Sequence, residues 1–338
     1  MKQLMFIEPG RAEWEEVPTA VLGSPKSALV RPTAVTTCAL DVAALMGLLS
    51  DKKPFALGHE FIGQITEIGD DVETVGVGDR VLVAFQISCG TCTRCLSGFT
   101  ANCEVVPKNS MFGLGPWSGG DYGGAIADLV EVPYADAMCL AISDHVHPAA
   151  ASLSDNTTDA WRAVGPLIDE AAPQPVLVVG NGAIGVASAA IAAALGSEVT
   201  YLSNDPADRE LASRFSVSVV ELDRYPKRTK QRYPITVSSG GDPDALNCAL
   251  RSTDLGGTCT DTGIFFEAAT AVPLLAMYDG GVTLTTGRAQ IRPAMSKVLE
   301  LVNSSRLDPS KLIHAEADFD DADAAMSSLT NKLLLTRS

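Results

Sequence analysis

The sequence predicts an α/β protein of two domains, one rich in short β-strands and one built on a doubly wound parallel sheet. Its 338 residues are the length of two ordinary domains. Up to about residue 145, short apolar runs are separated by Gly, Pro and Asp, as in proteins made of short strands. After residue 148, strand-like and helix-like runs alternate, which is typical of βαβ units on a parallel sheet.

The expected elements follow from local composition. In the first part, Phe61–Ile68 and Arg80–Phe85 are the expected strands, and glycines cluster from Gly113 to Gly124. The composition of 149–164 is that of a helix. Beyond it we expect strands at 175–179, 199–202, 217–222, 235–237, 257–262 and 282–286, and helices at 182–195, 206–215, 243–251 and after 293.

Composition narrows the possible functions. The chain is 46% hydrophobic and 20% charged, as expected of a globular protein. With 25 basic and 41 acidic residues its net charge is −16, which argues against a nucleic-acid or anionic-membrane partner. Residues 176–195 carry no charge, but their glycines and alanines favour a strand, a turn and a helix over a membrane span. No apolar leader is visible in residues 1–16, so we expect a cytoplasmic protein.

Four of the eight cysteines form a metal-binding pattern. Cys89, Cys92, Cys95 and Cys103 have the spacing C-x2-C-x2-C-x7-C. Each C-x2-C turn brings two thiolates to one Zn²⁺, and four thiolates leave no open position, so the spacing predicts a structural zinc. An iron–sulfur cluster uses similar spacings, but the bacterial pattern does not match this one. Disulfides are the other alternative, and the missing secretion signal disfavours them.

A glycine-rich turn follows the expected strand at 175–179. Gly180, Gly182 and Gly185 form G-x-G-x-x-G between a strand and a helix, the context that a dinucleotide-binding turn requires. The pyrophosphate of the dinucleotide is expected at the helix N-terminus, beside the N–H groups of Ala183 and Ile184. The alternative is a glycine turn that binds no ligand.

The end of the next strand bears on the choice of dinucleotide. An acid there usually binds the adenosine ribose of NAD. This strand ends in Ser203 and Asn204, and Asp205 is also a candidate cap for the helix that begins at Pro206. Because Arg209 could reach a 2′-phosphate, the sequence slightly favours NADP over NAD.

Three polar residues far apart in the sequence indicate a function only when they are considered together. Taken singly, Cys38 is a candidate core thiol, His59 a hydrogen-bonded histidine and Asp155 a helix N-cap. No spacing rule links them. A chain with a structural zinc and a dinucleotide turn nevertheless suggests a second, catalytic zinc on Cys, His and a carboxylate.

The order of these motifs resembles the zinc-dependent medium-chain alcohol dehydrogenases, on the threonine/sorbitol-dehydrogenase-like side of the family. The resemblance spans nearly the whole chain and rests on 38–41 (CALD), 58–63 (GHEFIG), 77–81 (VGDRV), the four-cysteine segment, 123–125 (GGA), Asp155-Asn156, the glycine turn, 287–288 (GR) and 305–309 (SRLDP). It implies a GroES-like catalytic domain of residues 1–147 and 289–338 and a Rossmann domain of residues 148–288. It also implies a homodimer or homotetramer, with a strand in Gly281–Thr286 pairing across the dimer.

The resemblance implies roles for individual residues. Cys38, His59 and Asp155 match the ligands of the catalytic zinc, and Glu60 matches an acid beside the metal that ligates transiently. Asp41 resembles the carboxylate that orients the ligand histidine. The segment around Gly287 and Arg288 is expected to contact the cofactor, so the resemblance implies two zinc ions and NAD(P) per chain.

One departure from the family pattern affects the expected chemistry. Leu40 stands where the family has a Ser or Thr that takes the proton of the alcohol. Thr37, Thr157, Thr158 or a water held by Glu60 are the possible replacements. The expected activity is hydride transfer between a nicotinamide cofactor and a small alcohol or carbonyl substrate. An imine or other C=N or C=C reductase and a non-catalytic dinucleotide-binding protein are the alternatives. Trp161 and Met111–Trp117 are candidates to line the substrate pocket.

Overall fold

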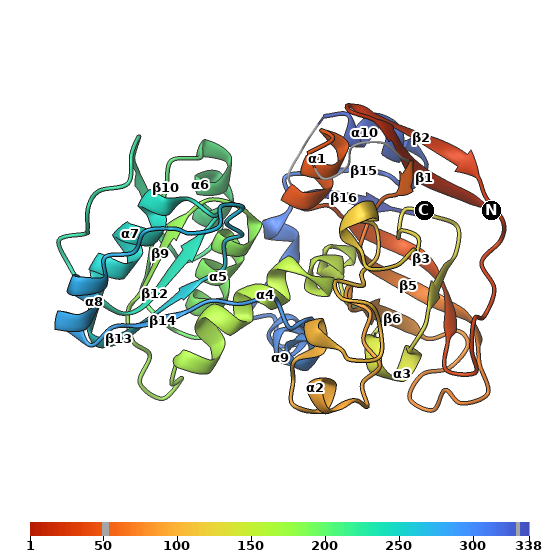
Figure 1. The fold of residues 1–338 in the computed structure, drawn as a ribbon, viewed down its shortest axis with the longest axis horizontal. Helices are drawn as coiled ribbons and strands as arrows, with labels where there is room; N and C mark the ends of the chain where they lie inside the picture. Colours follow the sequence, from red (N-terminus) through yellow and green to blue (C-terminus); the bar gives the residue numbers. More distant parts are fainter. Residues whose placement is uncertain (49–53, 329–331, 338) are drawn as a thin grey trace. The chain divides into compact units, whose positions relative to one another are not determined.

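The computed structural model describes residues 1–48, 54–328 and 332–337 (Figure 1). The chain forms two compact units. Unit 1 comprises Met1–Thr158, Gln290–Asn303 and Ile313–Ser338, and unit 2 comprises Asp159–Ala289 and Ser304–Leu312.

Apart from Ala289, which belongs to unit 2, these limits differ from the predicted ones in two segments. Residues 148–158 belong to unit 1, because Ser154 Oγ accepts a hydrogen bond from the Phe61 N–H and donates one to the Phe61 carbonyl, both at 3.0 Å. Residues 304–312 belong to unit 2, where Arg306 donates to the Ala194 carbonyl at 2.7 Å and pairs with Glu170 at 2.7 Å. In both segments, side-chain hydrogen bonds tie the segment to its unit, and local composition does not reveal them.

Unit 1 is built on a mostly antiparallel sheet with the strand order β15-β16-β3-β5-β6-β8, and β7 pairs with β3. Its longest pair is β3 (Ala28–Thr36) with β5 (Glu60–Ile68), in a register that sets Thr36 opposite Glu60. A second sheet has the order β2-β1-β4. The remaining strands of unit 1 are β1 (Lys2–Glu8), β2 (Arg11–Glu16), β4 (Phe55–Ala56), β6 (Arg80–Val83), β7 (Val130–Val132), β8 (Cys139–Ala141), β15 (Ala315–Asp318) and β16 (Leu333–Thr336).

Short helices connect these strands. The helix expected over 149–164 is interrupted: the 3-10 helix η3 (Pro148–Ser154) ends at Asp155, whose φ of −148° and ψ of −94° lie outside the helical region, and α4 (Asn156–Val164) follows. The break turns Asp155 out of both helices. The other helices of unit 1 are α1 (Ala39–Leu45), α2 (Thr93–Leu96), η1 (Thr100–Asn102), η2 (Gly115–Trp117), α3 (Ala135–Met138), α9 (Ile291–Asn303), η6 (Phe319–Asp321) and α10 (Ala322–Met326).

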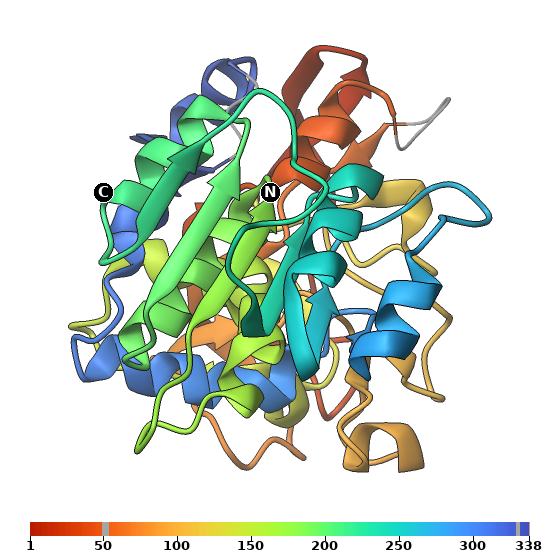
Figure 2. The same ribbon diagram turned by 90° about the vertical axis from the view of Figure 1, so that its left-hand side faces the viewer.

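Unit 2 is a parallel sheet with the strand order β11-β10-β9-β12-β13-β14 (Figure 2). The order reverses between β9 and β12, the crevice where doubly wound sheets bind dinucleotides. Its strands are β9 (Val176–Gly180), β10 (Val199–Ser203), β11 (Ser218–Glu221), β12 (Tyr233–Ser239), β13 (Thr253–Asp261) and β14 (Thr283–Thr285). Its helices are η4 (Gly165–Leu167), α5 (Ala183–Ala194), α6 (Pro206–Ser213), α7 (Pro243–Ser252), α8 (Leu274–Gly280) and η5 (Pro309–Leu312). The predicted alternation and fold class are confirmed.

The core of unit 2 explains the uncharged stretch in the sequence. All five residues of β9 are buried, and α5 buries a run of small residues that includes Ala187, Ala189 and Ala190. Small side chains let a helix lie close to the sheet, so 176–195 is a strand, a turn and a helix. Within the described part of the chain, no helix is long and apolar enough to cross a membrane.

Candidate metal and dinucleotide sites

Three side chains from distant parts of the sequence meet in unit 1. The Nε2 atom of His59 lies 3.5 Å from the Cys38 sulfur and 3.4 Å from Asp155 Oδ2. The donor atoms of these three residues all lie within 4.8 Å of one another, and all three residues are buried. Cys, His and carboxylate are the ligand types that catalytic zinc uses.

Local structure holds each member of this cluster in place. Cys38 is the N-cap of α1, and its sulfur accepts the Leu40 N–H at 3.3 Å. Asp41, in the first turn of α1, accepts the Cys38 N–H at 2.8 Å through one oxygen and lies 3.2 Å from His59 Nδ1 through the other. With Nδ1 facing Asp41, the Nε2 atom of His59 faces Cys38 and Asp155. This is the arrangement that a metal-binding histidine requires.

The charges around His59 favour a cation. Burial lowers the pKa of His59, but Asp41, Cys38 and Asp155 together raise it well above its usual value. Burial raises the pKa of the Cys38 thiol. A buried imidazole among two carboxylates and a thiol is therefore surrounded by more potential negative charge than it can neutralise alone, and a divalent metal fits this donor set.

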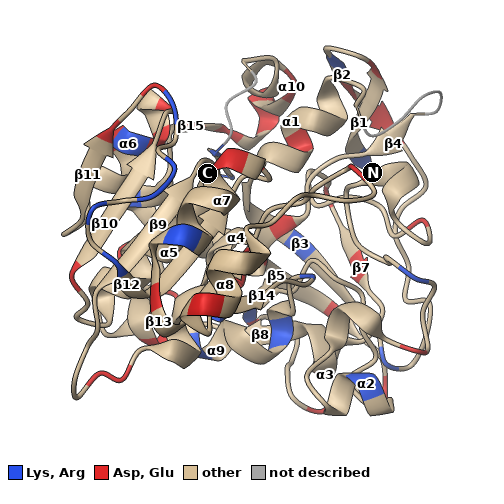
Figure 3. Cartoon of the chain, turned by 60° about the vertical axis from the view of Figure 1, so that its left-hand side comes forward, with Lys and Arg blue, Asp and Glu red and all other residues tan. Residues whose placement is uncertain are grey.

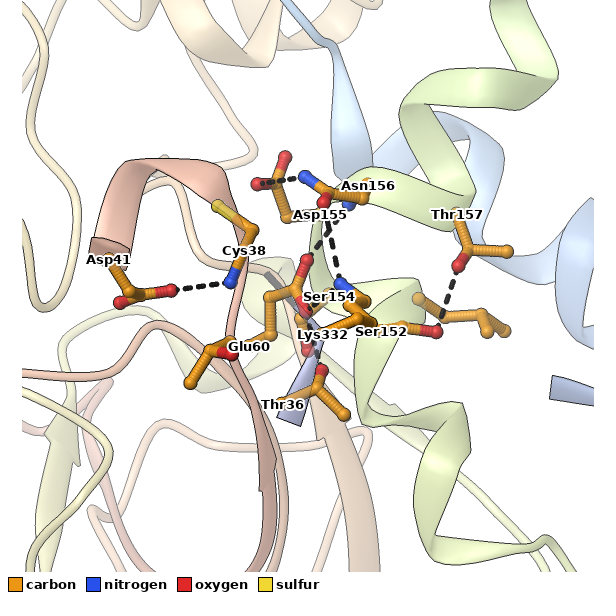
Figure 4. Close-up of polar contacts among 12 residues, drawn as sticks. Thr36, Cys38, Asp41, Glu60, Ser152, Ser154, Asp155, Asn156, Thr157 and Lys332 are labelled. Carbon is orange, nitrogen blue, oxygen red and sulfur yellow. Dashed lines mark hydrogen bonds and ion pairs between the residues drawn. The ribbon is translucent and has the colours of Figure 1, made fainter. Parts of the chain in front are cut away.

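A buried ion pair lies next to the cluster (Figure 4). Lys332 Nζ donates to Glu60 Oε2 at 2.5 Å, and both side chains are at most 1% exposed. The same oxygen of Glu60 accepts the Thr36 hydroxyl at 2.5 Å, and its other oxygen accepts the Asn156 N–H at 3.2 Å. Burial raises the pKa of Glu60 to about 7 despite the nearby ammonium.

Asn156 connects this ion pair to the metal cluster. Its side-chain oxygen accepts from Lys332 Nζ at 3.3 Å, and its side-chain nitrogen donates to Asp155 Oδ2 at 2.8 Å. Glu60, Lys332, Asn156 and Asp155 thus form one buried network, whose last member is a candidate metal ligand.

The cysteine segment of unit 1 forms a second cluster. The sulfurs of Cys89, Cys92, Cys95 and Cys103 lie within 4.8 Å of one another. The Cys92 and Cys103 sulfurs are 3.9 Å apart, close to the ~3.8 Å edge of a tetrahedron with Zn–S bonds of about 2.3 Å. The Glu104 N–H donates to the Cys92 sulfur at 3.5 Å, and such donors lower the pKa of Cys92 to about 6. All eight cysteines are free thiols, and these four fit a zinc ion.

The glycine turn lies at the carboxyl end of β9 in unit 2. Gly180 has a φ of +118°, and a Cβ there would come within 2.0 Å of the Ser239 carbonyl oxygen on β12. Gly182 has a φ of +95° and open space where a Cβ would be. At Gly185 a Cβ would press on Ser239 at 3.2 Å. The turn therefore leaves the backbone N–H groups of Ala183 and Ile184, in the first turn of α5, open to an anion.

Side chains at the end of the neighbouring strand β10 are hydrogen-bonded to Asn181 of the glycine turn and to Tyr225. Ser203 is buried, and its hydroxyl donates to Asn181 Oδ1 at 2.7 Å. Asn204 accepts from the Asn181 side chain at 2.7 Å and from the Tyr225 hydroxyl at 3.2 Å. Gly287 and Arg288 follow β14, which ends at the same carboxyl edge of the sheet.

The structure places the candidate proton-relay groups in other hydrogen bonds. Thr37 Oγ1 accepts the Leu333 N–H at 3.0 Å, and Thr158 Oγ1 donates to the Leu153 carbonyl at 2.6 Å. Thr157 Oγ1 pairs with the Ser152 hydroxyl at 2.8 Å. A hydroxyl has one donor and two acceptor positions, so each of these threonines keeps capacity for a further hydrogen bond.

Comparisons with known proteins agree with this geometry. Residues 24–144 match the family profile described as the alcohol dehydrogenase GroES-like domain. A probable zinc-binding alcohol dehydrogenase of Mycobacterium tuberculosis is 28% identical over 95% of this chain and 83% of its own length. The L-galactonate-5-dehydrogenase of Escherichia coli is 27% identical over 78% of this chain and 76% of its own length.

Residues 24–144 therefore match an alcohol dehydrogenase GroES-like domain, and the chain as a whole is similar to zinc-type alcohol dehydrogenases. An alcohol dehydrogenase from Thermus sp. ATN1 matches the whole of both chains, with 24% identity and a TM-score of 0.88. A putative zinc-binding dehydrogenase of Sinorhizobium meliloti, whose structure contains NADP, matches 99% of this chain and 98% of its own, with 19% identity and a TM-score of 0.80. These two likenesses establish the fold, and the resemblance read from the motifs is confirmed.

Sequence reasoning gave no role to Lys332 or to Asn156. Lys332 is 1% exposed, which is rare for a lysine unless it is paired. It precedes the apolar run Leu333–Leu335, and a single lysine before a strand is too common to single out. Asn156 follows the candidate ligand Asp155, and that adjacency was the available signal.

Proposed function

We propose that the chain is a zinc-dependent oxidoreductase that transfers a hydride between a nicotinamide dinucleotide and an alcohol or carbonyl substrate. The observation that carries the proposal is the convergence of Cys38, His59 and Asp155 on one buried point. A non-catalytic dinucleotide-binding protein has no need of this donor set.

The roles of the residues follow from their contacts. Cys38, His59 and Asp155 would hold the zinc ion. Bound zinc supplies Lewis acidity, which lowers the pKa of an alcohol or polarises a carbonyl. Asp41 keeps Nδ1 of His59 engaged so that Nε2 faces the metal position. Lys332 and the backbone N–H of Asn156 hold Glu60 beside the site, and a pKa of about 7 suits this carboxyl to take up or release a proton near neutral pH.

The four-cysteine segment would hold a second zinc ion with a structural role. Its donor set is complete, and complete sets leave no position for a substrate. In unit 2, the turn at Gly180–Gly185 would bind the pyrophosphate of the dinucleotide, with the nicotinamide as hydride acceptor or donor.

We also propose a homodimer through the outer edge of the sheet of unit 2. β14 is an edge strand, and edge strands offer unpaired backbone groups to another chain. Large apolar side chains are exposed nearby on α8, among them Leu274, Leu275 and Tyr278 at 69%, 74% and 83%. Such a surface is costly in water unless a second copy covers it. The free thiols support a location in the reducing cytoplasm.

Metal content and turnover test the proposal together. We expect two zinc ions per chain, and we expect Cys38→Ser and His59→Ala each to lose one of them while the fold is kept. A panel of secondary alcohols, followed by the absorbance of the reduced dinucleotide, should then show turnover only in the two-zinc protein. One zinc per chain in the unmodified protein would favour the non-catalytic alternative. Two zinc ions with turnover of imines or activated C=C bonds and none of alcohols would favour the reductase that Leu40 suggests.

A further inference from the structure

The first turn of α6 carries a carboxylate that the motif around residue 203 does not reveal. Asp208 is only 3% exposed, and its Oδ2 atom accepts the N–H of Gly182 at 2.6 Å. Gly182 is the second glycine of the dinucleotide turn, where open space replaces a side chain. A negative group therefore lies directly against the dinucleotide-binding turn.

The other polar groups at this strand end are already used. The carboxylate of Asp205 accepts the N–H groups of Ala207 at 2.8 Å and Asp208 at 3.3 Å, so it caps α6. The hydroxyl of Ser203 donates to Asn181. Asp208 is thus the acid that contacts the glycine turn, although it follows the last strand residue, Ser203, by five residues.

The guanidinium of Arg209, on the same helix, is also already hydrogen-bonded. Arg209 donates to the Ser203 carbonyl at 3.0 Å and to Glu221 at 2.9 Å, and its side chain is 15% exposed. Acidic and basic residues alternate along α6 (Figure 3). A 2′-phosphate here would place about two further negative charges near Asp208 and Glu221. The guanidinium of Arg209 already binds the Ser203 carbonyl and Glu221, so it is not free to neutralise them.

We infer that Asp208 takes the place of the strand-end acid, accepts hydrogen bonds from the adenosine ribose diol, and makes this chain select NAD(H) over NADP(H). An ionised carboxylate has about four lone-pair sites, and Gly182 uses one of them. The sequence slightly favoured NADP because residue 203 is not an acid. In the structure, Asp208 of α6 supplies an acid near this strand end. This inference rests on the proposed dinucleotide-dependent function.

The test is a direct binding measurement on the zinc-loaded protein. Dissociation constants for NADH and NADPH are measured by calorimetry or fluorescence for the unmodified chain, for Asp208→Asn and for the control Asp205→Asn. Asparagine keeps an oxygen for the Gly182 N–H but loses the charge. We expect NADH to bind about 10-fold to 100-fold more tightly than NADPH in the unmodified protein. Asp208→Asn should remove most of this ratio, and Asp205→Asn should leave it unchanged.

The possible failures can be told apart. Tighter binding of NADPH by the unmodified protein overturns the inference and leaves the proposed function intact. An equal loss of both dinucleotides in Asp208→Asn shows that the residue only supports the turn, and also overturns it. If neither dinucleotide binds to folded, zinc-loaded protein, the proposed function falls and the inference falls with it.

Discussion

The buried pair of Lys332 and Glu60 permits a quantitative prediction. Replacing Lys332 with Met removes an ammonium that lies 2.5 Å from Glu60 Oε2, where both side chains are at most 1% exposed. Breaking a buried ion pair on one side costs about 3–5 kcal/mol, because the other charge stays buried without compensation. Unit 1 is of the size at which each kcal/mol shifts the melting temperature by about 2–4 °C. We therefore expect the Tm of Lys332→Met to fall by about 6–20 °C.

The loss should depend on pH in a defined direction. Burial already raises the pKa of Glu60 to about 7, and removal of Lys332 raises it further because that cation lowers it. At pH ~8 the variant must either keep an unpaired carboxylate or protonate it, at about 1.4 kcal/mol for each unit by which the pH exceeds the ordinary pKa of a glutamate. Below pH ~7, Glu60 is largely neutral in the unmodified protein as well as in the variant, so the pH-dependent part of the difference disappears. The difference in Tm between the unmodified protein and the variant should therefore shrink as the pH falls toward ~6.

Two controls make this prediction refutable. The double variant Glu60→Gln with Lys332→Met removes both charges and should recover most of the loss. Lys297→Met breaks an exposed pair with Glu300, in which the lysine side chain is 56% exposed, and should change the free energy of unfolding by less than about 1 kcal/mol. The reasoning is refuted if Lys332→Met costs no more than Lys297→Met, or if the double variant is as unstable as Lys332→Met alone.

Three further predictions concern the metal sites, the cofactor and the assembly. Cys92→Ser should lose one zinc ion and lower the melting temperature while the folded fraction keeps its affinity for NADH; loss of turnover at unchanged stability would reverse the assigned roles of the two sites. Burial raises the pKa of Asp208 to about 6, so NADH binding followed by fluorescence should weaken below pH ~6 as the carboxylate that accepts the ribose hydroxyls is protonated, with Tyr201, Asp205 and Tyr225 as the other titratable groups around it. Tyr278→Asp should dissociate the dimer in sedimentation experiments, because it places a charge in the apolar surface of α8; an unchanged mass would contradict that interface.

Several features were predictable because they depend on residues close together in the chain. The alternation that predicted β9, α5, β10 and α6 comes from the periods of buried side chains, and each element ends within a few residues of its expected limits. The helix expected over 149–164 was the exception. Its composition is helical, but Asp155 leaves the helix to face His59, and local propensity does not contain that contact.

The sequence by itself therefore determined the two sites whose residues lie close together in the chain. C-x2-C-x2-C-x7-C and G-x-G-x-x-G specify which atoms can meet, because a few residues of chain limit their separation. The joining of Cys38, His59 and Asp155 could be anticipated only by family resemblance. Only the tertiary structure brought Lys332 to Glu60 and Asp208 to Gly182. Both contacts form where separate strands and helices pack together. Packing depends on the simultaneous burial of many side chains, so a short stretch of sequence does not predict it.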